Sequence, residues 1–369
     1  MKPPTRTTAN AHGARIGTLS PFPDGWFAAA FSSELKPGAV RTIRFMGGER
    51  VLYRTRSGRA CMVEPHCPHL GAHLGHGGQV DGDLLVCPFH SFRYATDGHC
   101  VSHGPQSGPG RIRTRTWPLR ELHGVIHAWH GAGGGEPAWP LPEADLEGFS
   151  AARETSLDVR GHIQNFTENT IDQGHYAPIH ALTDFRLDPP PRFDGHRMAV
   201  DLAARWRGLP FRMHLDIHGL GYCHLTSELP QLGARIAALV LPTPTGEETW
   251  VLRHAQRLRI PAFSRLPAPL RDAFYVPLTW YIDRWLKTQL TLDTRIWNYR
   301  RYPEHPRLVQ SDGPIMAYRR WAAQFYPAGE SAPADMRQAD TERRPANEIA
   351  RSHVRADALY SSSPLSDPS

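Results

Sequence analysis

Long hydrophobic runs are missing from the sequence. Its longest apolar stretches, Trp26–Phe31 and Ile236–Leu241, span about six residues, whereas a membrane-spanning helix needs about 20. Residues 1–17 carry scattered Lys and Arg without an apolar segment, so no secretory signal is predicted. The sequence therefore predicts no membrane span.

Cysteine is scarce, and blocks of like charge are absent. Five cysteines in 369 residues, an odd number, exclude a disulfide scaffold. The 42 Lys and Arg and 36 Asp and Glu leave a net charge of +6 that is spread along the chain, which argues against nucleic-acid binding. Histidine, at 21 residues, is abundant, and this surplus is the first indication of metal chemistry.

Turn signals and strand patterns divide the chain into two domains. Residues 21–138 predict an all-β domain, with short strands at Gly38–Met46 and Glu49–Arg54 joined at Gly47-Gly48. The glycine- and proline-rich break over Gly131–Pro137 marks the boundary.

Residues 139–327 predict a second domain with a sheet and a long helix. Helices are expected at Asn165–Ala177 and Phe274–Tyr299. Five strands of one sheet are expected at Arg197–Arg205, His214–Leu220, Tyr222–Leu229, Ile236–Leu241 and Thr249–Ile260. The ends of the chain, residues 1–20 and 328–369, have polar or Pro-rich compositions and are expected to be mostly disordered.

Two loops of the first domain each offer one thiolate and one imidazole. The first contains Cys67 and His69, and the second contains Cys87 and His90. A Rieske [2Fe–2S] cluster needs two Cys on one iron and two His on the other, and two mixed loops supply that set. Zinc is the alternative, but zinc motifs usually group Cys with Cys and His with His. The spacing therefore favours a Rieske cluster.

A second group of donors lies in the expected helix near residue 170. His175 and His180 with one carboxylate would form the facial set that binds non-haem Fe(II). The two histidines are about 140° apart on a regular helix, so we expect a kinked or unwound turn at Pro178 to bring them together. The alternative is a helix with ordinary surface histidines and acids.

Asp293 is the acid that the sequence favours as the third ligand. Asp172 is too close to both histidines and is expected instead to hydrogen-bond the second nitrogen of His175. A carboxylate on an apolar helix face is costly unless it is paired or bound to metal. The alternative to a metal-ligand role for Asp293 is a buried ion pair. The apolar residues on the face of Asp293 are Leu286, Leu290, Ile296 and Trp297.

Taken together, the motifs resemble the oxygenase component (α-subunit) of Rieske non-haem iron oxygenases over roughly residues 25–327. The most similar group includes aminopyrrolnitrin oxygenase, 3-ketosteroid 9α-hydroxylase oxygenase and cholesterol 7-desaturase. The resemblance implies an α+β chain, with an all-β Rieske domain and a helix-grip (START-like) catalytic domain built on an antiparallel sheet. It also implies an α3 trimer in which the cluster of one subunit serves the iron of the next.

The resemblance assigns roles to the matching residues. Cys67, His69, Cys87 and His90 match the cluster ligands, and His175, His180 and Asp293 match the iron ligands. Asp172 matches the acid that bridges an iron-ligand histidine to a cluster histidine of the next subunit. Ser91 departs from the pattern, which more often has Gly there.

The expected activity is O2-dependent oxidation, most simply monooxygenation, of a bulky apolar substrate. Desaturation and N-oxygenation use the same ligands, and a Rieske electron carrier or a zinc-containing lipid-binding protein are the non-enzymatic alternatives. The chain has no dinucleotide fingerprint, so a separate ferredoxin, reductase or both is implied. Iron-binding thiolates fit a cytoplasmic setting. The expected substrate-pocket residues are Gln164, Phe166, Ile179 and Trp297.

Overall fold

The computed structural model describes residues 19–103, 112–303 and 305–327. Residues 1–18 and 328–369, for which we expect disorder, lie outside these ranges. None of the described helices is long and apolar enough to cross a membrane.

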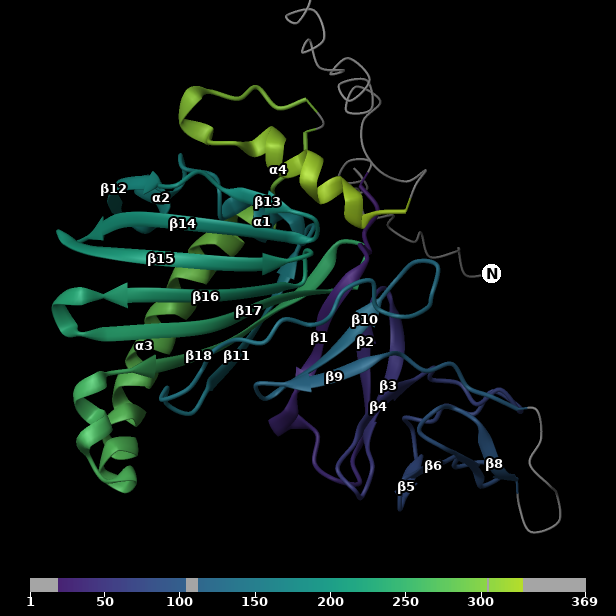
Figure 1. Ribbon diagram of the computed structural model, residues 1–369. Helices are drawn as coiled ribbons and strands as arrows, with labels where there is room; N and C mark the ends of the chain where they lie inside the picture. Colours follow the sequence, from purple (N-terminus) through teal and green to yellow (C-terminus); the bar gives the residue numbers. More distant parts are fainter. Residues whose placement is uncertain (1–18, 104–111, 304, 328–369) are drawn as a thin grey trace, which may run out of the picture. The chain divides into compact units, whose positions relative to one another are not determined.

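Small antiparallel sheets build the first half of the chain (Figure 1). One has the order β1-β10-β9, with strands at Gly25–Phe31, Val125–His130 and Leu119–Leu122. The next has the order β2-β3-β4, at Val40–Phe45, Gly48–Arg54 and Ala60–Val63. The third has the order β5-β6-β7-β8, at Gln79–Asp81, Leu84–Val86, Phe92–Tyr94 and Cys100–His103. The all-β prediction is confirmed.

The predicted hairpin between β2 and β3 is present. Met46 and Gly47 form its turn with φ of 48° and 74°. A two-residue hairpin turn of this kind needs positive φ at both central positions, which glycine adopts at little cost.

One eight-stranded antiparallel sheet dominates the second half, as Figure 1 shows. Its order is β11-β18-β17-β16-β15-β14-β12, and β13 pairs with β14. The bounds are Arg153–Arg160 (β11), Leu182–Leu187 (β12), Arg192–Asp194 (β13), Arg197–Trp206 (β14), Leu209–His218 (β15), Tyr222–Leu229 (β16), Ala234–Gly246 (β17) and Thr249–Arg259 (β18). The five predicted strands are confirmed. The sequence does not predict the other three, β11, β12 and β13, and the edge strand β11 has no clear hydrophobic alternation.

The helices are short, apart from α3. Their bounds are Gln164–Asn169 (α1), Tyr176–His180 (α2), Ala268–Trp297 (α3) and Ile315–Ala322 (α4), with 3₁₀ turns at Ser32–Glu34, Pro230–Leu232, Pro261–Arg265, Gln310–Asp312 and Ala323–Phe325. α3 packs against β11 and β18. It begins at Ala268 rather than Phe274, because Pro269 is tolerated in a first helical turn. The single helix expected at Asn165–Ala177 is wrong, since α1 and α2 replace it.

Hydrogen bonds join β1 to the large sheet. The guanidinium of Arg253 on β18 donates to the carbonyls of Ala28 and Ala29, at 2.9 and 3.0 Å. Thr243 on β17 donates its hydroxyl to the Ala28 carbonyl at 3.0 Å. The predicted domain boundary near residue 138 falls between β10 and β11, where the chain has no strand or helix, and it stays a prediction.

His127 on β10 is a buried histidine that should make the fold sensitive to acid. Its side chain is 0% exposed, neither ring nitrogen has a hydrogen-bond partner among the described residues, and burial lowers its pKa to about 3. Above pH ~6.5 both the folded and unfolded states are neutral at this position. As the pH falls from about 6.5 towards 3, the imidazole binds a proton in the unfolded state but not in the folded state. The free energy of unfolding therefore falls over this range.

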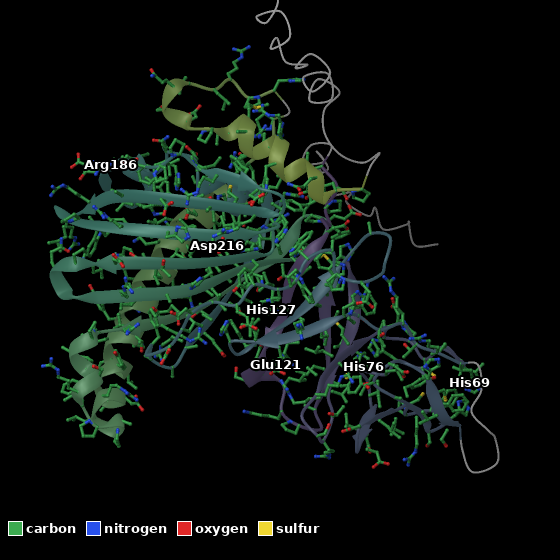
Figure 2. All side chains as sticks on the ribbon, in the orientation of Figure 1. His69, His76, Glu121, His127, Arg186 and Asp216 are labelled. Carbon is green, nitrogen blue, oxygen red and sulfur yellow. The ribbon has the colours of Figure 1, made fainter. Side chains whose placement is uncertain are left out.

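We therefore expect His127→Leu to flatten the acid side of the stability profile. At pH 4.5 the variant should exceed the wild type in free energy of unfolding by roughly 1–3 kcal/mol, with a smaller gain at pH 7.5. Urea unfolding at the two pH values measures this difference. His76→Leu, at an exposed histidine, is the control and should show no such pH dependence (both positions are marked in Figure 2). An equal gain in both variants would contradict the argument.

Candidate metal centres

The two loops that carry Cys67 and Cys87 have the same backbone turn. The carbonyl of Cys67 accepts the Gly71 amide at 2.9 Å, and the carbonyl of Cys87 accepts the Ser91 amide at 3.1 Å. Gly71 and Ser91 both adopt positive φ, of 78° and 59°. Because positive φ favours glycine, this geometry explains why the motif more often has Gly where this chain has Ser91, which adopts the conformation with strain.

The four donors of these loops separate into a sulfur side and a nitrogen side. Cys67 and Cys87 are buried, and burial together with the neighbouring Cys67 thiol raises the pKa of Cys87. The imidazoles of His69 and His90 lie with ring centroids 4.8 Å apart, and His90 is exposed. Tyr94 places its hydroxyl 2.9 Å from the Cys67 sulfur.

This division fits a two-iron cluster better than one zinc ion. A single zinc at its usual bond lengths gathers its ligand atoms within about 4 Å of one another. Among the described residues, no three of these four donors have ligand atoms that all lie within 4.8 Å of one another. Two sulfurs on one side and two imidazoles on the other match the ligand division of a Rieske cluster.

A second set of donors does converge on one point. The ligand atoms of His175, His180 and Asp293 all lie within 4.8 Å of one another. His180 Nε2 is 3.2 Å from Asp293 Oδ1, and the two imidazole centroids are 5.2 Å apart. Each side chain is about one-tenth exposed. The predicted triad is thus assembled by α2 and the C-terminal half of α3.

His175 and His180 converge because the helix is interrupted between α1 and α2, and not because of Pro178. After α1 the backbone leaves the helix, and the Asp172 carboxylate accepts the Gly174 amide at 3.0 Å. His175 then caps the single-turn helix α2, and His180 is its last residue. Pro178 lies in the first turn of α2, where a missing amide hydrogen is harmless.

The Nδ1 atoms of His175 and His180 are hydrogen-bonded to oxygen acceptors, which fixes the orientation of both rings. His175 Nδ1 donates to the backbone carbonyl of Asp172 at 2.7 Å, and His180 Nδ1 donates to Gln289 Oε1 at 3.0 Å. Both imidazoles therefore present an unprotonated Nε2 to the centre. The sequence assigned the bond to the carboxylate of Asp172, but that group is 3.9 Å from Nδ1, and the carbonyl makes the bond.

Asn169 and Gln289 are functional candidates that the sequence analysis missed. The amide of Asn169 lies 3.0 Å from His175 Nε2 and donates to Asp293 Oδ1 at 3.3 Å, so it joins two of the three donors. Gln289 precedes Asp293 by one helical turn. That spacing on α3 was a usable signal for Gln289, whereas nothing in the sequence linked Asn169 to Asp293.

Burial and charge shift the pKa values of His175 and His180 in opposite directions. Burial lowers the pKa of His175, which keeps it neutral and available as a ligand. Burial also acts to lower the pKa of His180, but the Asp293 carboxylate outweighs it and raises that pKa. Burial raises the pKa of Asp172.

A buried ion cluster holds α1 in place next to the triad. The Glu168 carboxylate is 1% exposed and accepts hydrogen bonds from Arg319 at 2.8 Å and from Arg300. The Arg319 guanidinium also lies over the ring of Tyr302, 4.0 Å from its centroid. Glu168 immediately precedes Asn169, so this cluster fixes the backbone from which the Asn169 amide reaches the donors.

The expected pocket residues are mostly buried. Phe166 and Trp297 contact edge to face with centroids 6.4 Å apart, and Ile179 is half-buried. Gln164 is 1% exposed, and its side-chain oxygen has no hydrogen-bond partner within the part of the chain that the structure describes. Ile296 was expected on the apolar face of Asp293, but it is 51% exposed, so that expectation is wrong.

Comparison with known proteins gives matches to both halves. The Rieske [2Fe–2S] domain family matches residues 25–118, and the 3-ketosteroid 9α-hydroxylase C-terminal domain family matches residues 128–326. The cholesterol 7-desaturase of Bombyx mori is 31% identical over 83% of this chain and 70% of its own. The oxygenase component of the Rhodococcus rhodochrous 3-ketosteroid-9-alpha-monooxygenase is 24% identical over 86% of this chain and 87% of its own. The crystal structure of dicamba monooxygenase bound to dicamba superposes with a TM-score of 0.62 at 18% identity, covering 86% of this chain and 98% of that one.

The ion cluster around Glu168 yields a stability prediction. Glu168→Gln removes the charge that two buried or partly buried guanidinium groups face, and uncompensated buried charge is expensive. We expect the free energy of unfolding to fall by about 3 kcal/mol in urea titrations. Glu228→Gln, which loosens only the exposed pair with Arg235, should cost less than about 1 kcal/mol. Equal losses in the two variants would show that the buried cluster has no special role.

Proposed function

Because the chain belongs to the Rieske non-haem iron oxygenases with a catalytic domain of the 3-ketosteroid 9α-hydroxylase type, we propose that it oxidises a bulky, largely apolar, sterol-like substrate with O2. The chain is an oxidoreductase of the kind that carries a Rieske [2Fe–2S] cluster and a mononuclear iron. The convergence of His175, His180 and Asp293 is the observation that supports an enzyme over an electron carrier.

The proposed cluster ligands are Cys67, His69, Cys87 and His90, and the proposed iron ligands are His175, His180 and Asp293. When bound, the cluster supplies single electrons, and the iron supplies O2 activation at the positions that a facial triad leaves open.

The protein's own part is to orient these donors. The carbonyl of Asp172 and the amide oxygen of Gln289 hold the two imidazoles in the tautomer that a metal needs. The Asn169 amide steadies the Asp293 carboxylate, and the burial of all three donors limits access of bulk water.

Electrons come from separate proteins, since the related ketosteroid enzyme is the oxygenase component of a multicomponent system. A ferredoxin, a reductase or both is the donor we propose. We also propose a homotrimer in which Asp172 connects neighbouring subunits. In support, Asp172 keeps 29% of its side chain exposed, and His90 is exposed beside the apolar side chains of Leu70 and Phe89. The five free cysteines suit a cytoplasmic location.

Desaturation is the second candidate reaction. It is favoured by the 31% identity to a cholesterol 7-desaturase, whereas the match of residues 128–326 to the 3-ketosteroid 9α-hydroxylase C-terminal domain favours hydroxylation. Incubation of the reconstituted system with sterols and 3-ketosteroids, followed by mass spectrometry, separates the two. Gain of one oxygen atom indicates monooxygenation, and loss of two hydrogen atoms indicates desaturation. Unchanged sterols and ketosteroids, with full reduction of the cluster, would contradict the proposed substrate class.

The iron site gives a direct test. Asp293→Ala should lower iron from about three to about two per chain and abolish turnover, while the electron paramagnetic signal of the reduced cluster is retained. Asp283→Ala is the control on the same helix, because Asp283 accepts a hydrogen bond from Thr155 instead of facing the donors. It should keep three irons. Full iron content in Asp293→Ala would remove Asp293 from the ligand set.

Gln164 gives a prediction about substrate. A buried amide oxygen without a partner is costly, and a hydroxyl of the substrate would satisfy it. Gln164→Leu should therefore lower kcat/KM for a hydroxylated sterol by about tenfold relative to its deoxy analogue, without changing iron content. Competition assays with the two sterols measure this ratio. An unchanged ratio would place the Gln164 oxygen outside the pocket.

A further inference from the structure

The N-terminal half of α3 is attached to the sheet along one side only. Tyr275 and Thr279 are its buried residues. The Tyr275 hydroxyl accepts the Ile260 amide at 3.0 Å, and the Thr279 carbonyl accepts the side-chain amide of Gln256 at 2.7 Å. Tyr275 also packs with Ile236 and Leu258 from the sheet. These contacts fix which face of the helix points away from the protein.

The opposite face of this half-helix is apolar and aromatic. Leu270, Phe274, Pro277 and Tyr281 recur at four- and three-residue spacing, and Trp280 lies beside them. Phe274 is 47% exposed, Trp280 52% and Tyr281 61%. Single exposed apolar side chains are normal, but a continuous stripe of them marks an interaction surface. We call Leu270, Phe274, Pro277, Trp280 and Tyr281 the outer stripe.

Positive charge surrounds the outer stripe. The charged residues from the preceding 3₁₀ turn to the middle of α3 are four cations, Arg265, Arg271, Arg284 and Lys287, and two acids, Asp272 and Asp283. Asp283 is hydrogen-bonded to Thr155, and Asp272 pairs with Arg271 at 3.6 Å. Cations around Trp, Tyr and Phe complement the anionic headgroups of a phospholipid surface, where aromatic side chains also concentrate.

A second copy of the chain fits this face less well. A helix–helix seam would continue the apolar spacing along α3. The next positions of the outer stripe are Arg284 and Thr288, so the apolar pattern stops after about three turns. The length of the outer stripe suits shallow contact with a lipid surface.

We propose that the outer stripe docks the enzyme on an anionic phospholipid surface, from which its apolar substrate is taken up. This proposal rests on the proposed function for the identity of the substrate. α3 also connects the surface to the chemistry, since Tyr281 and Asp293 are separated by about 18 Å of the same helix.

The test is co-sedimentation of the iron-loaded holoenzyme with vesicles of phosphatidylcholine containing one-third phosphatidylglycerol. Phe274→Ser, Trp280→Ser and Tyr281→Ser combined should reduce vesicle binding by about tenfold or more, with cluster absorbance and iron content unchanged. Leu209→Ser combined with Val309→Ser is the matched control, because both residues are exposed and apolar but lie outside α3. It should bind like the wild type. Arg271→Glu with Arg284→Glu should lose binding on these vesicles.

A second measurement does not depend on how the triple variant folds. Vesicles with brominated acyl chains should quench the tryptophan fluorescence of the wild type more than that of Trp280→Phe, because only the former places an indole in the lipid. Equal quenching would overturn the proposal.

Other outcomes also decide the matter. Absence of vesicle binding by the wild type, or equal binding by the triple variant, would overturn the docking surface. So would a change of oligomeric state in the triple variant by sedimentation velocity, since a second copy would then cover the stripe. These measurements need no substrate. Vesicle binding without turnover of any sterol would therefore count against the proposed function and leave the docking surface supported.

Discussion

The buried carboxylate of Asp293 is the constraint on which the catalytic half depends. Its residue is 8% exposed on a helix that packs against the sheet, and burying a charge there is costly without compensation. The amide of Asn169, which donates to the carboxylate, supplies part of that compensation. A bound cation would supply the rest, so the same property that makes Asp293 costly for the fold suits it to the proposed role of a metal ligand.

Similar reasoning applies to Glu168, which is even more deeply buried. Its charge is neutralised within the protein, by Arg300 and Arg319, whereas the partners of Asp293 among the described residues are imidazole and amide groups. The two carboxylates therefore have different uses. Glu168, with two guanidinium partners, stabilises the fold. Asp293, with neutral nitrogen partners, still has charge available to bind a metal.

Local pattern was sufficient for much of the fold and for proposing the two ligand sets. The cluster loops and the five central strands follow from spacing and alternation, because a turn or a half-buried strand is determined within a few residues. The choice of Asp293 also came from local pattern, although Ile296 proved exposed. The single helix at 165–177 was wrong because no periodicity rule shows that the Asp172 carboxylate would accept the Gly174 amide and end the helix.

Contacts between distant segments were beyond the reach of such patterns. The pairing of Glu168 with Arg319, the reach of Asn169 to Asp293 and the anchoring of His180 by Gln289 each join residues more than one hundred positions apart. No spacing rule connects such pairs in a single sequence. They are fixed by the packing of α1, α3 and α4 against the sheet.

These separations have a consequence for how the chain is made. All four proposed cluster donors lie between Cys67 and His90 and are available once residue 90 has been synthesised. The set of proposed iron donors is complete only when residue 293 has been synthesised. The ion pair of Glu168 with Arg319 can form only 151 positions after Glu168 itself. Since domains generally fold from the N-terminus during synthesis, the sulfur-bearing loops can close before the iron site, which can form only after residue 293 has been added.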